Sequence, residues 1–80
     1  MSNAAKLLDQ MRRNLRDWRI EDLRVVAASI GLIVQPGKGS HVKFSHAHLS
    51  MLVVIPARRP IREVYVRRFI QLIDEVAKAT

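Results

Sequence analysis

Apolar residues recur at helical spacing in three parts of the chain. The first stripe predicts a short amphipathic helix over residues 5–15 and consists of Leu7, Leu8, Met11 and Leu15. The second predicts a helix that ends at Gly31 and consists of Trp18, Ile20, Leu23, Val26, Ala27 and Ile30. The third predicts a closing helix at about residues 62–79 and consists of Tyr65 or Val66, Phe69, Ile70, Ile73 and Val76. Asp17 is the candidate N-cap of the second helix, with Glu21 and Asp22 in its first turn.

Between the second and third stripes the pattern becomes that of β-strands. Residues 32–35 are rich in β-branched side chains and stop at Pro36-Gly37, and residues 41–45 alternate polar and apolar with period two. Residues 51–55 are apolar on both faces and stop at Pro56, after a turn at residues 46–50. The predicted order is α(α)βββα. It indicates one small α+β domain with a three-stranded antiparallel sheet and both main helices on one face.

Parity along the second strand predicts which side chains stay outside the core. Val42 and Phe44 are the apolar pair, so they are expected to face the helices. His41, Lys43 and Ser45 then face the opposite side, toward solvent or a partner. His41 is therefore expected on an open sheet face rather than in the core.

The third strand has apolar residues of both parities. Leu52 and Val54 point to the side opposite Met51, Val53 and Ile55, so helices on one face leave one set uncovered. The uncovered set predicts either a docking surface for another chain or a face that the N-terminal helix folds over. The sequence leaves both alternatives open.

Composition narrows the class of protein. The 80-residue chain carries 14 Lys and Arg against 7 Asp and Glu, a formal net charge of +7, which points to an anionic partner, either nucleic acid or an acidic protein. It has no cysteine, which excludes a disulfide framework and a thiol nucleophile and fits a reducing compartment. No apolar run approaches the roughly 20 residues of a membrane helix, and no signal peptide is visible, so we expect a cytoplasmic protein without a membrane partner.

The distribution of acids constrains the chemistry. No Asp or Glu occurs between Asp22 and Glu63, so the strand region offers no carboxylate to hold Mg²⁺. A phosphodiester would then be cleaved without metal, by histidine acid–base catalysis and cationic stabilisation. RNA is favoured over DNA because it supplies its own nucleophile, the 2′-hydroxyl. A zinc site built from His41, His46 and His48 is disfavoured because their spacing matches no recognised ligand pattern.

Arginine is concentrated in two parts of the chain. One cluster consists of Arg58, Arg59, Arg62, Arg67 and Arg68, and the other of Arg12, Arg13, Arg16 and Arg19. Each is either a surface that follows a phosphate backbone or a solvated helix face. The loop Gly37-Lys38-Gly39-Ser40 lacks the spacing of a phosphate-binding P-loop, and a hairpin turn explains its glycines.

Taken together, several segments resemble the HicA-type toxins of bacterial and archaeal toxin–antitoxin systems. They are Gly31-Leu32, Gly39-Ser40-His41-Val42-Lys43-Phe44, and Val54-Ile55-Pro56 followed by a basic final helix. The resemblance covers roughly residues 18–77. It indicates a HicA-like domain at residues 17–80, behind an N-terminal extension at residues 1–16 whose first four residues are a candidate expression scar. It implies a fold like that of a double-stranded-RNA-binding domain.

The resemblance also implies an activity and partners. HicA-type toxins are small endoribonucleases (mRNA interferases) that cut mRNA without a metal or other cofactor and stall translation, and a HicB-type antitoxin blocks them. The family's catalytic histidine falls on His41, with Gly39 and Ser40 in the same motif. Strand parity and the distribution of charge single out His41 independently.

The expected site is therefore a histidine among cations. His41 is the expected general base on a 2′-hydroxyl, and the source of the second proton stays open. The expected RNA-binding residues are Lys38, Gly39, Ser40, Lys43, Arg58, Arg59 and Arg62. Two alternatives remain: a non-catalytic RNA-binding module with the same fold, and a basic interaction domain that binds only an acidic protein.

Overall fold

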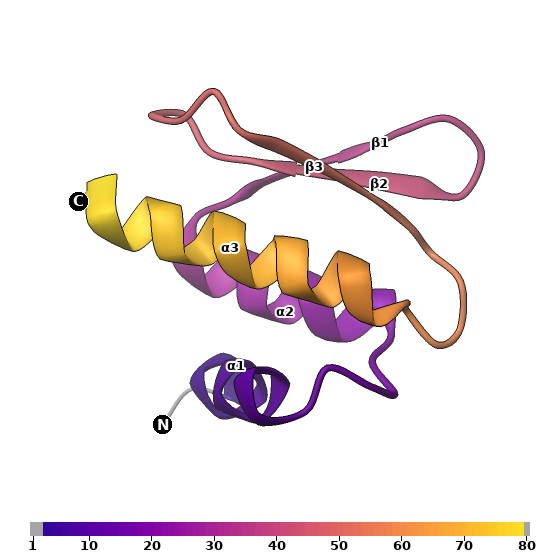
Figure 1. Cartoon of the computed structure of the whole chain (residues 1–80). Helices are drawn as coiled ribbons and strands as arrows, with labels where there is room; N and C mark the ends of the chain where they lie inside the picture. Colours follow the sequence, from indigo (N-terminus) through magenta and orange to yellow (C-terminus); the bar gives the residue numbers. More distant parts are fainter. Residues whose placement is uncertain (1–2, 80) are drawn as a thin grey trace.

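The computed structural model describes residues 3–79, which form three helices and three strands (Figure 1). In chain order they are α1 (Asn3–Arg13), α2 (Ile20–Ile30), β1 (Ile33–Pro36), β2 (His41–Ser45), β3 (Leu52–Pro56) and α3 (Glu63–Ala79). The predicted α(α)βββα order is confirmed. Of the candidate expression scar, Asn3 and Ala4 begin α1, and Met1 and Ser2 lie outside the described residues.

The strands form one antiparallel sheet in the order β1-β2-β3. Val42 lies opposite Ile55 and Phe44 opposite Val53, and all four side chains are buried. Both α2 and α3 cover this face of the sheet, as predicted, and α1 lies beneath them as a third layer (Figure 1). Lys43 and Val54, which lie between these buried residues, therefore point to the open face, and His41, just before Val42, is exposed, as predicted.

The core joins the sheet to the helices. Phe44 from β2 and Phe69 from α3 meet edge to face, with ring centroids 5.1 Å apart. Around them lie the buried side chains of Met11, Leu23, Val26, Ala27, Leu32, Val42, Val53, Ile55, Ile61, Val66, Leu72, Ile73 and Val76. Met11 is fully buried, so α1 contributes to this core from the side away from the sheet.

The two ends of α2 differ in how well the sequence predicts them. Gly31 ends the helix as expected, with a φ of 81° that glycine adopts without strain. The prediction that Asp17 is the N-cap is wrong. The N-cap is Arg19, whose backbone N–H donates to the Asp22 carboxylate at 3.0 Å. Asp17 instead lies in the preceding loop. A hydrogen bond from the segment before α3 holds this loop: the Ile61 N–H donates to the carbonyl of Trp18 at 2.8 Å.

The position of α1 rules out the alternative in which the N-terminal helix folds over the open face of the sheet. Because α1 packs on α2 and α3, it covers none of that face. Leu52 keeps 54% of its surface exposed and Val54 37%. Among residues 3–79, no helix combines the length and the apolar character that crossing a membrane requires.

One ion pair between α1 and α3 makes stability depend on pH. Arg12 donates to the Asp74 carboxylate at 2.7 Å, and this hydrogen bond, together with its positive charge, lowers the pKa of Asp74. A carboxyl whose folded pKa is depressed adds stability above its unfolded pKa, and that stability is lost as the pH falls. Both side chains are more than 40% exposed, so the effect is small.

Asp74→Asn is therefore expected to lower the free energy of unfolding at pH 7 by at most about 1 kcal/mol. The difference from the wild type should shrink as the pH falls below about 4, where the wild-type carboxyl also becomes neutral. Urea unfolding at pH 7 and at pH 3 measures it. Glu75→Gln, on an exposed pair within α3, is the control. An equal loss of unfolding free energy at both pH values would show that the Arg12–Asp74 ion pair does not cause the pH dependence.

Candidate functional site

The β1–β2 hairpin holds the ring of His41 in one position. The backbone N–H of His41 donates to the carbonyl of Lys38 at 3.1 Å, and Nδ1 of the imidazole ring lies 2.8 Å from the same oxygen. On the other side of the hairpin, the Gly37 N–H donates to the His41 carbonyl at 2.8 Å. Gly39 turns the chain between these contacts with a φ of 58°, which favours glycine.

This contact also fixes where the proton of the ring lies. A carbonyl oxygen only accepts hydrogen bonds, so Nδ1 of His41 carries the hydrogen. In the neutral ring Nε2 then has the free lone pair and is the basic atom. The Lys38 carbonyl would also stabilise the imidazolium that forms once Nε2 takes a proton. The hairpin thus presents a histidine prepared to accept a proton at Nε2.

His41 forms one wall of a surface hollow. The hollow is lined by Ser40, His41, Pro56, Arg58, Arg62 and Tyr65. Antiparallel pairing sets His41 opposite Pro56, and the Ala57 N–H donates to the Ser40 carbonyl at 3.0 Å, so the segment after β3 runs beside the hairpin. Arg62 and Tyr65, around the start of α3, also line the hollow, and the hairpin, the end of β3 and the start of α3 share one end of the molecule (Figure 1).

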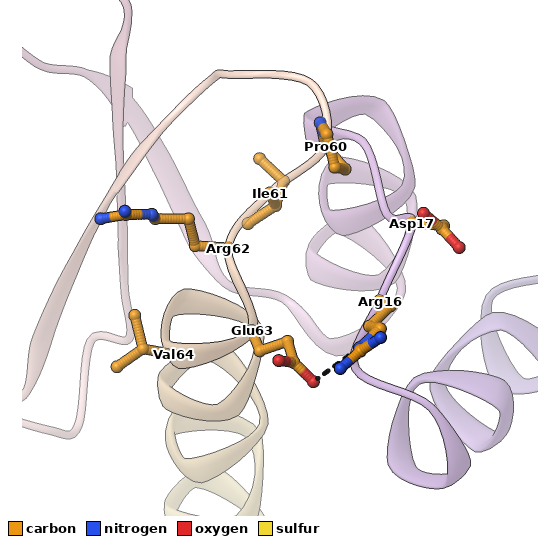
Figure 2. Close-up of a pocket in the computed structure, with 7 residues that line it drawn as sticks. All are labelled: Arg16, Asp17, Pro60, Ile61, Arg62, Glu63 and Val64. Carbon is orange, nitrogen blue, oxygen red and sulfur yellow. Dashed lines mark hydrogen bonds and ion pairs between the residues drawn. The ribbon is translucent and has the colours of Figure 1, made fainter.

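The hollow is positively charged because its arginines have no acidic partner. Within residues 3–79, neither Arg58 nor Arg62 makes an ion pair. Figure 2 shows Arg62 reaching away from Glu63, whose carboxylate binds Arg16 at 3.4 Å instead. The other acidic residues with ion pairs also use cations outside the hollow: Asp9 with Arg13, Glu21 with Arg59, Asp74 with Arg12 and Glu75 with Lys78.

The structure brings only some of the expected RNA-binding residues to the hollow. Ser40, Arg58 and Arg62 line it with His41. Arg59 turns away and lies 3.5 Å from Glu21, near the start of α2. Lys43 points to the open sheet face between Gln35 and Val54. Lys38 and Gly39 belong to the turn, where Lys38 contributes its carbonyl to His41.

Three residues of the site were not expected from the sequence. The sequence predicts Tyr65 or Val66 on the apolar stripe of the last helix, yet Tyr65 lines the hollow, together with Arg62 just before the helix. The sequence predicts Pro56 only as the end of a strand, yet it pairs with His41 and lines the hollow with it. Gly37 was treated as part of a turn, but a Cβ there would lie 3.1 Å from the Cβ of His41.

The other two histidines lie away from the hollow. His46 and His48 follow β2 at the end opposite His41, with ring centroids 5.5 Å apart. The His48 N–H donates to Nδ1 of His46 at 3.2 Å. In the described part of the chain, no three His, Cys, Asp or Glu side chains gather as they would to hold a metal ion.

The tight space at Gly37 gives a prediction about the ring. Gly37→Ala places a methyl group 3.1 Å from the His41 Cβ and 3.3 Å from its carbonyl oxygen, so the hairpin must shift. We expect a loss of about 1 kcal/mol in unfolding free energy and a smaller population of the Nδ1–H form of His41. Nitrogen NMR of the imidazoles reports that population directly.

Gly31→Ala is the matched control for Gly37→Ala. It strains a left-handed position by about 1 kcal/mol but lies at the end of α2, away from the ring. The control should lose similar stability and keep the wild-type ring signals. Unchanged His41 signals in Gly37→Ala would show that the hairpin does not hold the ring.

The open face of the sheet adds a second feature beside the hollow. Ile33, Leu52 and Val54 form an exposed apolar patch, with 41%, 54% and 37% of their surface accessible. Lys43 lies between the strands that carry them, directly opposite Val54. The described strands contain no acidic residue, so the patch is apolar with a positive centre.

Two features therefore bear on function: the hollow with a basic Nε2, two unpaired guanidinium groups and a phenol, and the apolar patch on the open face of the sheet. Comparison with known proteins adds no relative from which roles for these residues could be taken. No protein-family model, no curated protein and no solved structure matches the chain.

Proposed function

We propose that this chain is a metal-independent endoribonuclease whose catalytic base is His41. The observation that carries the proposal is the contact between Nδ1 of His41 and the Lys38 carbonyl, which leaves Nε2 free to take a proton inside a cationic hollow. A base, fixed in its tautomer and set beside guanidinium groups that bind phosphate, has the parts that RNA cleavage requires.

In this proposal the RNA attacks itself. Nε2 of His41 removes the proton from a 2′-hydroxyl, and the 2′-oxygen forms a bond to the adjacent phosphorus. Arg58 and Arg62 bind the non-bridging oxygens and stabilise the charge that grows on them. The bond from phosphorus to the 5′-oxygen then breaks, leaving a 2′,3′-cyclic phosphate and a 5′-hydroxyl end. No carboxylate lines the hollow, so nothing competes with phosphate for the arginines.

The resemblance to HicA-type toxins supports a cellular role for this activity. We propose that the chain cuts mRNA in the cytoplasm and thereby stalls translation, as toxins of that type do. The HicA-like motif Gly39-Ser40-His41 coincides with the turn that holds the ring. Induced expression should then arrest growth.

Cleavage of a defined RNA tests the activity. The purified chain, with a chelator present, should cut a single-stranded RNA and leave a DNA strand of the same sequence intact. A single 2′-deoxy nucleotide at the cleaved position should block the cut there. RNA binding without new ends would instead support a non-catalytic RNA-binding module. No RNA binding even at low salt would support a basic interaction domain.

The apolar patch supports the proposed antitoxin partner. Ile33, Leu52 and Val54 offer apolar contact, and Lys43 and the neighbouring hollow offer positive charge. An acidic protein complements both features, whereas a second copy of this chain would bring like charges together. We propose that a HicB-type antitoxin of net negative charge docks on this patch and covers the hollow.

Introducing a negative charge on the patch is expected to release the chain from that partner. Co-expression of a HicB-type antitoxin of net negative charge should relieve growth arrest by the wild type. Leu52→Glu should still arrest growth. It should bind the partner at least about 10-fold more weakly, so co-expression should relieve the arrest less. Val25→Glu, on an exposed apolar residue of α2, is the control and should still be relieved. Equal relief of both variants would place the partner elsewhere.

A further inference from the structure

We infer that Tyr65 donates the proton that the leaving 5′-oxygen needs. The inference rests on the proposed function, because it completes the reaction that His41 begins. One base removes a proton from the 2′-hydroxyl, but the departing 5′-oxygen would leave as a high-energy alkoxide unless a second group protonates it. That second group is the phenol of Tyr65, which lines the same hollow as His41.

The proton and electron balance of the step is simple. The 2′-oxygen gives its proton to Nε2 of His41 and forms the new bond to phosphorus. The bond between phosphorus and the 5′-oxygen breaks, and the electron pair on that oxygen takes the phenol proton of Tyr65. His41 is left as imidazolium and Tyr65 as phenolate, and exchange of one proton through solvent restores both. No oxidant, metal or second substrate is needed.

The composition of the hollow points to Tyr65 by elimination. Guanidinium groups keep their protons, so Arg58 and Arg62 bind phosphate but do not act as acids. The hydroxyl of Ser40 is far too weak an acid. His41 holds its one proton toward the Lys38 carbonyl while Nε2 acts as the base. Among the residues that line the hollow, only the Tyr65 phenol can give up a proton to the alkoxide.

The histidines that serve as acids in other sites are too far away here. His46 and His48 lie beyond the opposite end of β2, separated from His41 by a strand that rises about 3.3 Å per residue. They also do not line the hollow. A proton relay from either ring to the leaving oxygen would have to cross the open face of the sheet.

The geometry of Tyr65 suits a donor. Its ring is half-buried on the first turn of α3, and within residues 3–79 its hydroxyl makes no hydrogen bond. His41 comes from the sheet and Tyr65 from the helix, so they approach a bound phosphate from two different elements. Cleavage in line requires the base and the acid on opposite sides of phosphorus, and a phosphate bound in the hollow would meet groups from both the sheet and the helix. Arg62, one turn earlier, places positive charge near the phenolate that forms.

Tyr65→Phe tests the inference on two substrates. It removes only the hydroxyl, and because that hydroxyl has no hydrogen-bond partner among residues 3–79, the variant should fold normally. On ordinary RNA we expect cleavage to fall by about 10²-fold. On an RNA whose scissile 5′-oxygen is replaced by sulfur, the leaving thiolate needs no proton, so Tyr65→Phe should cut at close to the wild-type rate.

The same pair of substrates separates this inference from the proposed function. His41→Ala should lose activity on both substrates, because the 2′-hydroxyl still needs a base. Equal losses of Tyr65→Phe on both substrates would overturn the inference and make the hydroxyl a phosphate ligand. An unchanged rate on ordinary RNA would also overturn it, with water as the donor. Wild-type rates for His41→Ala would instead refute the proposed function itself.

Discussion

Replacing His41 with alanine is expected to lower the rate of RNA cleavage by about 10³-fold. The substitution removes Nε2, the free nitrogen of a ring that the Lys38 carbonyl holds through Nδ1. The ring is exposed on the open face of the sheet, so its loss removes little packing. Single-turnover cleavage of a short RNA under saturating protein measures the chemical step.

His48→Ala is the matched control for this experiment. It removes a second exposed imidazole, at the far end of β2, and should leave cleavage unchanged. Both variants should bind RNA with nearly wild-type affinity, since the arginines stay in place. A His41→Ala protein that folds, binds and cuts at the wild-type rate would rule out this histidine as the base.

The alternation of residues 41–45 made half of this site predictable. Val42 and Phe44 could only be the buried pair, and a period of two then placed His41 and Lys43 outside. The structure confirms the bounds of this strand, with Val42 and Phe44 buried and His41 exposed. Polarity along one strand thus predicted both part of the core and the exposure of the candidate base.

The sequence predicts that arginines contribute to the site, but it does not predict which of them line the hollow. Arg58, Arg59 and Arg62 look equivalent in sequence, yet Arg59 pairs with Glu21 while the others line the hollow. The segment that carries them has no regular secondary structure, so no period assigns its side chains to a face. Its course is fixed by a distant contact, from the Ile61 N–H to the Trp18 carbonyl.

The same contact explains why the N-cap of α2 was predicted in the wrong place. Asp17 has the side chain of a good cap, but its backbone belongs to the loop that Trp18 ties to Ile61. The indole of Trp18 also donates to the Asn14 carbonyl at 2.7 Å, which holds that loop together. Tertiary hydrogen bonds therefore override a local cap preference here.

Arg58 and Arg62 line the hollow and Arg59 does not, so their substitutions are expected to differ strongly in their effect on RNA cleavage. The double variant Arg58→Gln/Arg62→Gln is expected to lower kcat/KM for RNA by about 10²-fold, because it removes both groups that would meet the phosphate oxygens. Glutamine keeps most of the length and polarity of the side chain, so what is lost is the charge. Steady-state cleavage at several salt concentrations measures the loss.

Arg59→Gln is the matched control, since it removes the same charge one residue away. Its partner is Glu21, in an exposed pair of 3.5 Å whose loss costs well under about 1 kcal/mol of stability. The control should keep near-wild-type cleavage. The double variant should also weaken the salt dependence of RNA binding, because each phosphate contact to a single strand contributes about 0.7 to the slope of the logarithm of affinity against that of salt. If Arg59→Gln is as damaging as the double variant, net charge rather than the hollow would account for RNA affinity.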